Sequence, residues 1–267
     1  MSSLSHSVSD STTMLRRNLL HMVRYPSVTL LVAGMPIIFL LLFVYVFGGT
    51  LGAGLGGAAG GGSGGRAEYV EYVVPGILMM GIAGSAQGTA ISIAMDMTEG
   101  IIARFRTMAI ARASVMTGHV IGSVLQTLLG LVAVVGVALL VGFRPTTGPT
   151  EWLALLGVLT LIALALTWLS TALGMVTKTV EAASNLPMPL ILLPFLGSGF
   201  VPTDSMPSGL RWFAEYQPFT PFIETIRSLL LGTPIGSSAV QTVAWCVGIS
   251  LLGYLWALKL YNRDPAH

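Results

Sequence analysis

Residues 96–117, DMTEGIIARFRTMAIARASVMT, form a charged, helix-compatible stretch between two long apolar segments. A chain that is otherwise apolar needs a reason to place charges at this point. We interpret the stretch as a cytoplasmic loop on which another protein acts, and the rest of the chain as the membrane part that the loop moves. The charged residues of the stretch are Asp96, Glu99, Arg104, Arg106 and Arg112.

The composition places the chain in a lipid bilayer. Of its 267 residues 54% are hydrophobic and only 9% are charged, whereas soluble domains are about a quarter charged. The net charge of +2 does not indicate nucleic acid as a partner. The single cysteine, Cys246, excludes an internal disulfide and a cysteine-cluster metal site. Since it lies in an apolar run, we expect a small buried residue rather than a reactive thiol.

Six apolar segments are long enough to cross a membrane, which takes about 20 residues at about 1.5 Å each. They are 27–47, 72–94, 118–141, 152–176, 185–201 and 239–261. The fifth contains Pro187, Pro189 and Pro194, so we expect it to be kinked and packed inside the bundle. The predicted fold class is an all-α integral membrane protein with six transmembrane helices, forming a single domain over residues 1–267.

The N-terminal residues are predicted to stay attached to the membrane rather than to be cleaved. Residues 1–12 are expected to be a disordered tail without the basic start of a signal peptide. Residues 13–25 fit an amphipathic helix at the cytoplasmic lipid interface, with Arg17 and Arg24 on its polar face. The alternative is a frayed tail with accidental periodicity. Pro26 would separate this helix from the first span.

Basic residues in the loops predict the orientation, because cytoplasmic loops carry an excess of Lys and Arg. One side would hold Arg16, Arg17, Arg24, Arg104, Arg106, Arg112, Lys178, Lys259 and Arg263, and the other Arg66, Arg144, Arg211 and Arg227. We therefore expect a multi-pass protein of the cytoplasmic (cell inner) membrane. Both termini, the 96–117 loop and the 177–184 loop would lie in the cytoplasm.

The second span is unusually polar in one part. Ser85, Gln87 and Thr89, with the nearby Met79 and Met80, are candidates for a substrate path, because polar groups in a bilayer face protein or a water-filled cavity. Hydrogen bonding between helices is an equally good interpretation. Glycines four residues apart, at Gly84 and Gly88, permit close helix packing, or they have no role in pairing. Residues 48–65, with 11 glycines, are predicted to be a flexible external linker.

The external stretch 202–236 is too charged to span the membrane and too apolar to remain free in water. We predict a re-entrant helical hairpin that dips into the outer leaflet, with Pro218 and Pro221 at its turn. Glu224 and Arg227 are three residues apart and could pair on one helix face. The candidate hairpin residues are Pro207, Trp212, Phe213, Glu215, Pro218, Pro221, Glu224 and Arg227.

The sequence lacks the motifs of an enzyme that would supply its own energy. Neither of the two lysines, Lys178 and Lys259, follows a glycine, so there is no phosphate-binding P-loop. The four histidines are scattered and predict no metal site. No carboxylate lies at the centre of a predicted span, as a proton-coupled carrier would require. Uphill transport would therefore draw its energy from another chain.

Two groups of short motifs resemble type-2 ABC transporter permeases, especially those of the daunorubicin/doxorubicin-resistance type. The first is EGI at 99–101, RFR at 104–106 and IARASV at 110–115. The second is SGFVP at 198–202, MP at 206–207, LRWF at 210–213, QP at 217–218, TP at 220–221 and ETIR at 224–227. Ala109 stands where the family usually has a proline, so the shape of this loop is the point at which the resemblance is weakest.

The resemblance implies a transport subunit without ATPase activity, which binds no cofactor because ATP and magnesium lie on its partner. Two copies of an ABC ATP-binding subunit would bind two permease copies, either identical or similar to each other. Ile101, Ile102, Phe105 and Met108 would supply an apolar docking face, and Asp96, Glu99, Arg104 and Arg106 its specificity. Gly100, Arg112, Arg17 and Arg24 complete the expected coupling set. The alternative is a solvated connector that touches only lipid head groups.

The function predicted from these observations is ATP-driven export of a hydrophobic or amphipathic compound, such as a drug or an antibiotic, by alternating access. A lipid or glycolipid is the alternative cargo. From other classes, an intramembrane lipid-modifying enzyme and a passive channel or structural membrane protein remain alternatives.

Overall fold

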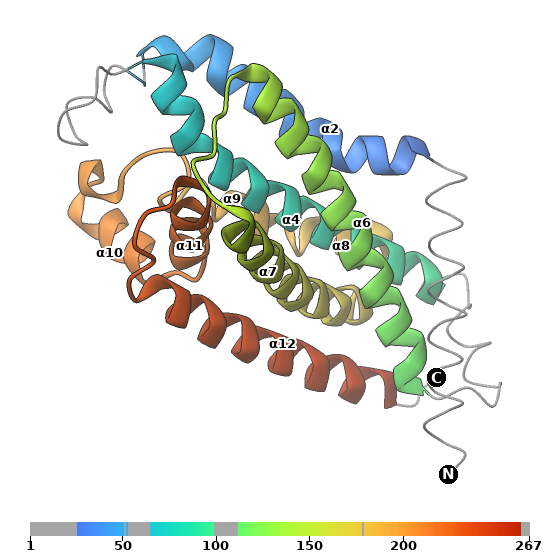
Figure 1. The fold of residues 1–267 in the computed structure, drawn as a ribbon. Helices are drawn as coiled ribbons and strands as arrows, with labels where there is room; N and C mark the ends of the chain where they lie inside the picture. The colour runs from blue at the N-terminus through green and yellow to red at the C-terminus, as the bar shows by residue number, and fades with distance from the viewer. Residues whose placement is uncertain (1–25, 51, 53–64, 99–111, 178, 263–267) are drawn as a thin grey trace.

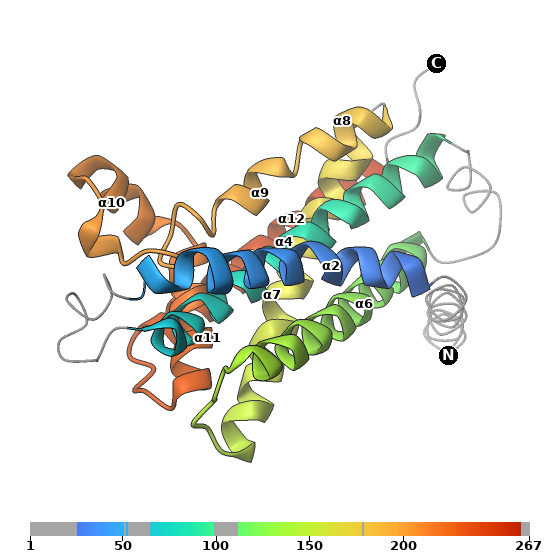
Figure 2. The ribbon, with the colours of Figure 1, turned by 90° about the horizontal axis from the view of Figure 1, so that it is seen from above.

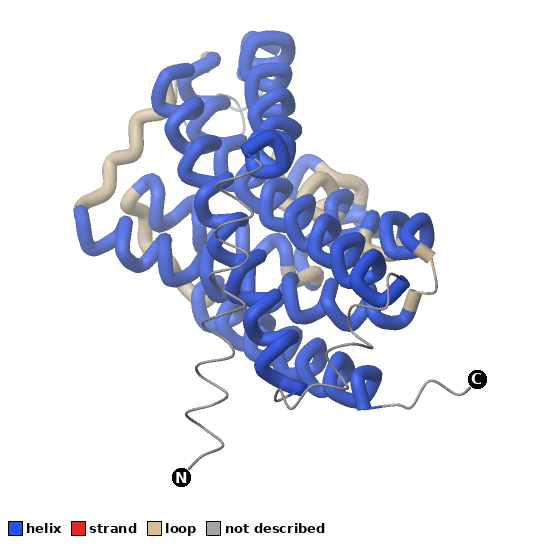
Figure 3. Tube along the Cα trace, turned by 90° about the vertical axis from the view of Figure 1, so that its right-hand side faces the viewer, coloured by secondary structure: helices blue, strands red, loops and turns tan. Residues whose placement is uncertain are grey.

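The computed structural model describes residues 26–50, 52, 65–98, 112–177 and 179–262, and every regular element in these ranges is helical (Figure 3). Five helices in the described ranges are long and apolar enough to cross a membrane, which makes this a multi-pass membrane protein. The predicted interfacial helix at 13–25, most of the glycine-rich linker and residues 99–111 lie outside the described ranges.

The long helices agree with five of the six predicted segments. In chain order they are α2 (Pro26–Leu42), continued by the π-helical turn η1 (Phe43–Phe47), α4 (Arg66–Thr98), α6 (Arg112–Val141), α7 (Pro149–Val176) and α12 (Ser238–Asn262). The shorter elements are α8 (Val180–Asn185), α9 (Met188–Leu192), η2 (Thr203–Ser205), α10 (Ser208–Tyr216) and α11 (Phe219–Leu231). With 33 residues, α4 is about 50 Å long, so it extends beyond a hydrocarbon core of about 30 Å.

Helix α4 is the centre of the bundle. It packs against α2, α6, α7, α8, α9 and α11. Of the most apolar 18-residue stretch of α4, 72% is buried, whereas 17% of the corresponding stretch of α12 is buried. Figure 1 shows α2 and α12 at opposite edges, with α4, α6 and α7 between them. The edge helices therefore leave most of their apolar surface to lipid or to other chains, while α4 is enclosed by this chain.

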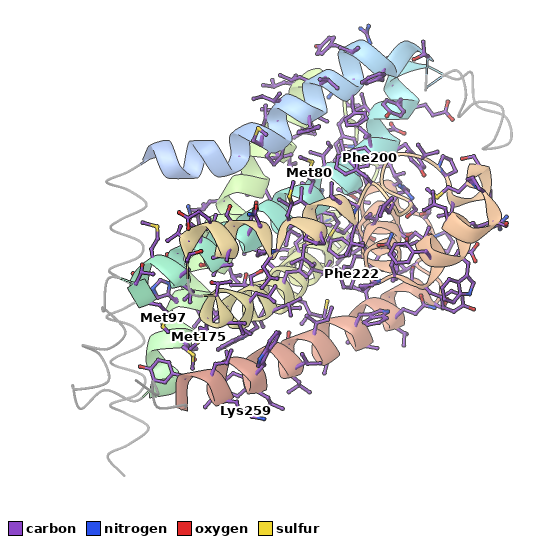
Figure 4. All side chains as sticks on the ribbon, turned by 180° about the vertical axis from the view of Figure 1, so that it is seen from behind. Met80, Met97, Met175, Phe200, Phe222 and Lys259 are labelled. Atoms are coloured by element: carbon purple, nitrogen blue, oxygen red, sulfur yellow. The ribbon has the colours of Figure 1, made fainter. Side chains whose placement is uncertain are left out.

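The helix ends fall into two groups, at opposite ends of the bundle (Figure 2). One group contains the start of α2, the end of α4, the start of α6 and the end of α12. The other carries α10 and α11. In Figure 4, Phe200 and Phe222 lie at the end with α10 and α11, and Met97, Met175 and Lys259 lie at the other end.

The fifth predicted span, 185–201, is not a continuous helix, so five of the six predicted transmembrane helices are present as long apolar helices in the described ranges. Helix α8 ends at Asn185, α9 covers only Met188–Leu192, and residues 193–200 form turns. The predicted kink is confirmed, because the helix is interrupted within this segment. Its cause is Pro187, Pro189 and Pro194, which lack the N–H that a helix needs and crowd the preceding turn.

This broken segment nevertheless runs alongside α4 in the opposite direction. Gln87 Nε2 donates a hydrogen bond to the carbonyl oxygen of Ser184, and a Cβ atom added to Gly76 would lie 2.6 Å from the carbonyl oxygen of Gly199. The chain therefore makes a sixth passage from one end of the bundle to the other. One face of the segment is exposed, including Leu186, Met188 and Leu192, so it lies at the edge of this chain and not inside the bundle as expected.

Glycines permit close approach of backbones at other positions than the predicted pair. A Cβ atom at Gly84 or Gly88 would meet nothing within 4 Å. In contrast, a Cβ atom at Gly174 on α7 would lie 2.5 Å from the carbonyl oxygen of Ala90 on α4, and one at Gly253 on α12 would lie 2.7 Å from the backbone of α7. The packing of α4, α7 and α12 therefore depends on these two small residues.

A glycine-to-alanine pair on α7 tests this packing. Gly174→Ala should lower the free energy of unfolding by about 1–3 kcal/mol, because a methyl group forces the α4 and α7 backbones apart. Gly157→Ala is the matched control in the same helix, where nothing lies within 4 Å. It should be neutral or stabilise the protein by up to about 1 kcal/mol, because alanine favours helix. Thermal unfolding in detergent measures both variants, and equal melting temperatures would contradict the packing described here.

Candidate functional site

All but two of the predicted coupling residues belong to the connection between α4 and α6, of which the structure describes only the two ends. Asp96 lies in the last turn of α4, and Arg112 is the first described residue of α6. The remaining predicted residues lie outside the described ranges, namely Arg17, Arg24, Glu99, Gly100, Ile101, Ile102, Arg104, Phe105, Arg106 and Met108. The end of α4 and the start of α6 both lie at the end of the bundle opposite α10 and α11 (Figure 2).

The side chain of Asp96 contacts that of His119, a residue that the sequence patterns did not identify. The Nε2 atom of His119 lies 2.9 Å from Oδ2 of Asp96, and both side chains are about one-fifth exposed. An acidic residue at a helix C-terminus is unfavourably placed against the helix dipole, and the histidine on α6 offsets this. The pair therefore ties α4 to α6 close to the connection that joins them. The sequence does contain one signal for this contact, because Asp96 lies near the end of α4 and His119 near the start of α6, the next helix.

The polar part of α4 is used for contacts between elements of this chain. Ser85 Oγ and Thr127 Oγ1 are 2.5 Å apart and link α4 to α6, while Thr89 donates a hydrogen bond to the Ser85 carbonyl within α4. Gln87 links α4 to α8. Met79 and Met80 are buried in the core. These contacts match the hydrogen-bonding interpretation, and the use of the five residues as a cargo path stays a prediction.

An apolar groove, which no sequence pattern indicated, lies between α6 and α7. Its volume is about 770 Å³, within the range of cavities that hold drug-sized molecules. The lining residues are Leu128, Leu131, Val132, Val135, Thr147, Gly148, Pro149, Trp152, Leu153, Leu155, Leu156 and Leu159. With Thr147 as the one polar side chain in this lining, the groove fits an apolar occupant.

The predicted hairpin region forms two helices with different environments. Helix α10 is largely exposed, including Pro207 before it and Trp212, Phe213 and Glu215 within it. Helix α11 is buried and packs against α4, α7 and α12. Pro218 lies at the turn as predicted, but Pro221 lies in the first turn of α11, where its carbonyl accepts hydrogen bonds from Thr225 and Thr242. Whether the hairpin enters the outer leaflet stays a prediction.

The charged side chains of α10, Arg211 and Glu215, are exposed. Arg211 forms ion pairs with Asp204 at 2.7 Å and with Glu215 at 2.8 Å. The hydrogen bond to Glu215, together with the charges of both carboxylates, raises the pKa of Arg211. Such exposed pairs contribute about 0–1 kcal/mol each, so they orient α10 without fixing it to the bundle.

Arg227 on α11 joins three elements of the structure. Its Nη2 atom donates hydrogen bonds to the carbonyl oxygens of Ser198, at 2.6 Å, and Tyr72, at 3.3 Å. Its guanidinium carbon lies 4.1 Å from the centre of the Tyr72 ring, which is cation–π geometry. Arg227 thereby connects α11 to α4 and to the turns of the broken segment.

The predicted Glu224–Arg227 pair is therefore wrong as a direct contact. Among the described residues, the ion pairs within 4 Å do not include it, because the carbonyl groups and the Tyr72 ring occupy the guanidinium. Burial lowers the pKa of Arg227 and raises the pKa of Glu224, while the attraction between the two charges opposes both shifts. Tyr72, Ser198 and Arg227 have no sequence spacing in common that could have revealed this cluster.

A second side chain from the hairpin region also supports the broken segment. Gln217 Nε2, between α10 and α11, donates to the carbonyl oxygen of Leu193 at 3.2 Å. Phe195 and Phe200 stack within the same segment with ring centres 4.4 Å apart, and Phe200 also contacts Phe43 of η1. The irregular backbone at 193–200 is thus held from α11 on one side and from α4 and η1 on the other.

A double-mutant cycle tests the link between α4 and α6. Asp96→Asn and His119→Gln should each lower the free energy of unfolding by up to about 1 kcal/mol, and the double variant should lose less than their sum, because a partly exposed pair couples by about 0.2–1 kcal/mol. Thermal unfolding of the four proteins gives the coupling energy. Strictly additive effects would show that the two side chains do not interact.

The comparisons with known proteins agree with this architecture. The profile of the ABC-2 type transporter family matches residues 10–231. The chain is 28% identical over 264 residues to the daunorubicin resistance ABC transporter permease protein DrrB1 of Streptomyces coeruleorubidus, an alignment that covers 97% of this chain and 88% of that protein.

Two further relatives are more distant or match a shorter part. The probable doxorubicin resistance ABC transporter permease protein DrrC of Mycobacterium tuberculosis is 23% identical over 195 residues, which cover 73% of this chain and 71% of the relative. Nodulation protein J of Rhizobium leguminosarum bv. viciae is 31% identical over 122 residues, which cover 43% of this chain and 46% of that protein.

Proposed function

The chain belongs to the ABC-2 type transporter family, and from this premise we propose that it exports a hydrophobic or amphipathic compound, such as a drug or an antibiotic. Membrane domains of this family carry no ATPase site of their own and pair with ATP-binding subunits. The cargo class is supported by the alignment with a daunorubicin resistance permease over 97% of this chain. An apolar groove of about 770 Å³ is compatible with such cargo.

The proposed complex contains two ATP-binding subunits and two permease chains in the cytoplasmic membrane. Both termini and the connection between α4 and α6 face the cytoplasm, as the distribution of Lys and Arg predicts. Residues 96–112 contact the ATP-binding subunit: the apolar face from Ile101 to Met108 docks, and the surrounding charges set specificity. Arg17 and Arg24 lie beside this contact on the interfacial helix.

In the proposed cycle, ATP binding closes the two ATP-binding subunits and moves the connection between α4 and α6. Support for α4 as the element that carries this movement comes from its contacts. It is joined to α6 by Asp96 and His119 near one end, and its Tyr72 meets Arg227 of α11 near the other. Movement of α4 would therefore reach both the cytoplasmic connection and the external hairpin, which is what alternating access requires.

Substitutions in the proposed docking face test the coupling. The double variant Arg104→Glu with Phe105→Ala should reduce stimulation of the partner's ATPase activity by about tenfold or more, since it removes one apolar anchor and inverts one charge at the interface. Membrane insertion should be unchanged. Arg211→Glu is the control, because Arg211 is an exposed residue of α10 at the opposite end of the bundle. Normal stimulation by the double variant would contradict the docking role.

Transport assays test the cargo. Cells that express the chain with its ATP-binding subunit should accumulate less daunorubicin than cells in which the catalytic lysine of that subunit is replaced. The difference should disappear when the permease is omitted. Equal accumulation in all strains would reject an anthracycline as cargo, and a lipid or glycolipid that appears in the outer leaflet only with active ATPase would replace it. Lipid turnover by the purified chain alone would reject transport altogether.

A further inference from the structure

Arg227 carries a charge that the fold must compensate, since a charged side chain inside a membrane domain is unfavourable unless it has partners. Its Nε atom is inaccessible and has no hydrogen-bond partner among the described residues. Its direct partners are two backbone carbonyl groups and the side chain of Tyr72, and Glu224 attracts it without direct contact. The charge is thus only partly compensated in this conformation.

The hydrogen bond from Arg227 to the carbonyl oxygen of Ser198 has a specific structural role. Ser198 lies among the turns of residues 193–200, outside any helix that could supply an N–H four residues further on. Within a lipid environment an unpaired carbonyl is unfavourable, and the guanidinium of Arg227 satisfies it at 2.6 Å. Arg227 therefore fixes the broken segment against α4, next to the backbone contact between Gly76 and Gly199.

Glu224 offers Arg227 an alternative partner. It lies three residues earlier on α11, on the same helix face, and is partly exposed. In the present conformation the two charges are not in direct contact, and the guanidinium is directed to α4 and the broken segment. A shift of the segment away from α4 would release Arg227, and Glu224 could then take the place of the Ser198 carbonyl.

We propose that Arg227 is a positioning residue for transport, which latches the broken segment to α4 in this conformation and exchanges the Ser198 carbonyl for Glu224 when ATP binding moves α4. This inference rests on the proposed function, because the movement is that of an ATP-driven permease. The broken segment is suited to the role, since Pro187, Pro189 and Pro194 lie close together in it and residues 193–200 form turns instead of a helix. The latch assigns a residue to the opening step at the end of the bundle that carries α10 and α11.

A cysteine at position 198 reports the latch directly. Ser198 is 4% exposed, so a Ser198→Cys side chain should react with a polar maleimide only after release. Cys246, the single native cysteine, is replaced by alanine in all variants. The permease bound to its ATP-binding subunit is placed in nanodiscs, which expose both faces, and labelling is timed without nucleotide and after trapping with ATP and vanadate.

The latch makes distinct predictions for each variant. The parent should label slowly without nucleotide and at least about tenfold faster when trapped, the factor that loss of one hydrogen bond from a charged donor produces. Arg227→Gln should label fast in both states, and Glu224→Gln slowly in both. Arg211→Gln is the matched control on exposed α10, and it should behave like the parent. Arg227→Lys cannot stack and donate hydrogen bonds in the same manner. In this variant the cysteine at position 198 should therefore label faster than in the parent without nucleotide. This variant provides the test if Arg227→Gln does not assemble.

Slow labelling of the Arg227 variants without nucleotide, or a parent rate that nucleotide does not change, would overturn the latch. Failure of the cargo proposal gives a different result. If daunorubicin is not exported but labelling still depends on nucleotide and on Arg227, the latch stands and only the cargo is wrong. If daunorubicin is exported while labelling is insensitive to both, the transport function stands and the latch is rejected.

Discussion

The constraint that organises this structure is that backbone polar groups in a bilayer must find partners within the protein. Long helices meet most of it by their own backbone hydrogen bonds, and five such helices are long and apolar enough to span the bilayer in the described ranges. The segment at 185–201 cannot, because its prolines interrupt the helix, and the surrounding elements supply what is missing. Gln217 and Arg227 bond to the carbonyls of Leu193 and Ser198. The burial of α11, unusual for a connection between spans, follows from this requirement.

The same constraint explains why α4 is the central helix. Its small residues let neighbouring backbones approach, at Gly76 and at Ala90 opposite Gly174. Its polar residues bond to α6 and α8 instead of facing lipid. As a result α4 contacts both the start of α6, through Asp96, and α11, through Tyr72. A single helix about 50 Å long thus connects the two ends of the bundle.

Much of the fold could be predicted from the sequence, because a run of about 20 apolar residues has few alternatives to a spanning helix. The prolines predicted the kink at 185–201, but the pattern could not show that the helix would be lost there, since that depends on partners far along the chain. Spacing alone suggested that Glu224 pairs with Arg227, whereas tertiary contacts with Tyr72 and Ser198 prevail. His119 was not recognised, because its partner Asp96 is 23 residues away on another helix. The predicted docking residues from 99 to 108 lie outside the described ranges, so their role depends on the resemblance to the family.

The central claim is that the connection between α4 and α6 is where this permease receives the movement of its ATP-binding subunit. The most direct measurement is a cryo-EM structure of the permease with that subunit. We expect the subunit to contact residues 99–111, between the ends of α4 and α6 that Asp96 and His119 hold together. A complex in which the subunit contacts the end with α10 and α11, or never touches these residues, would contradict it.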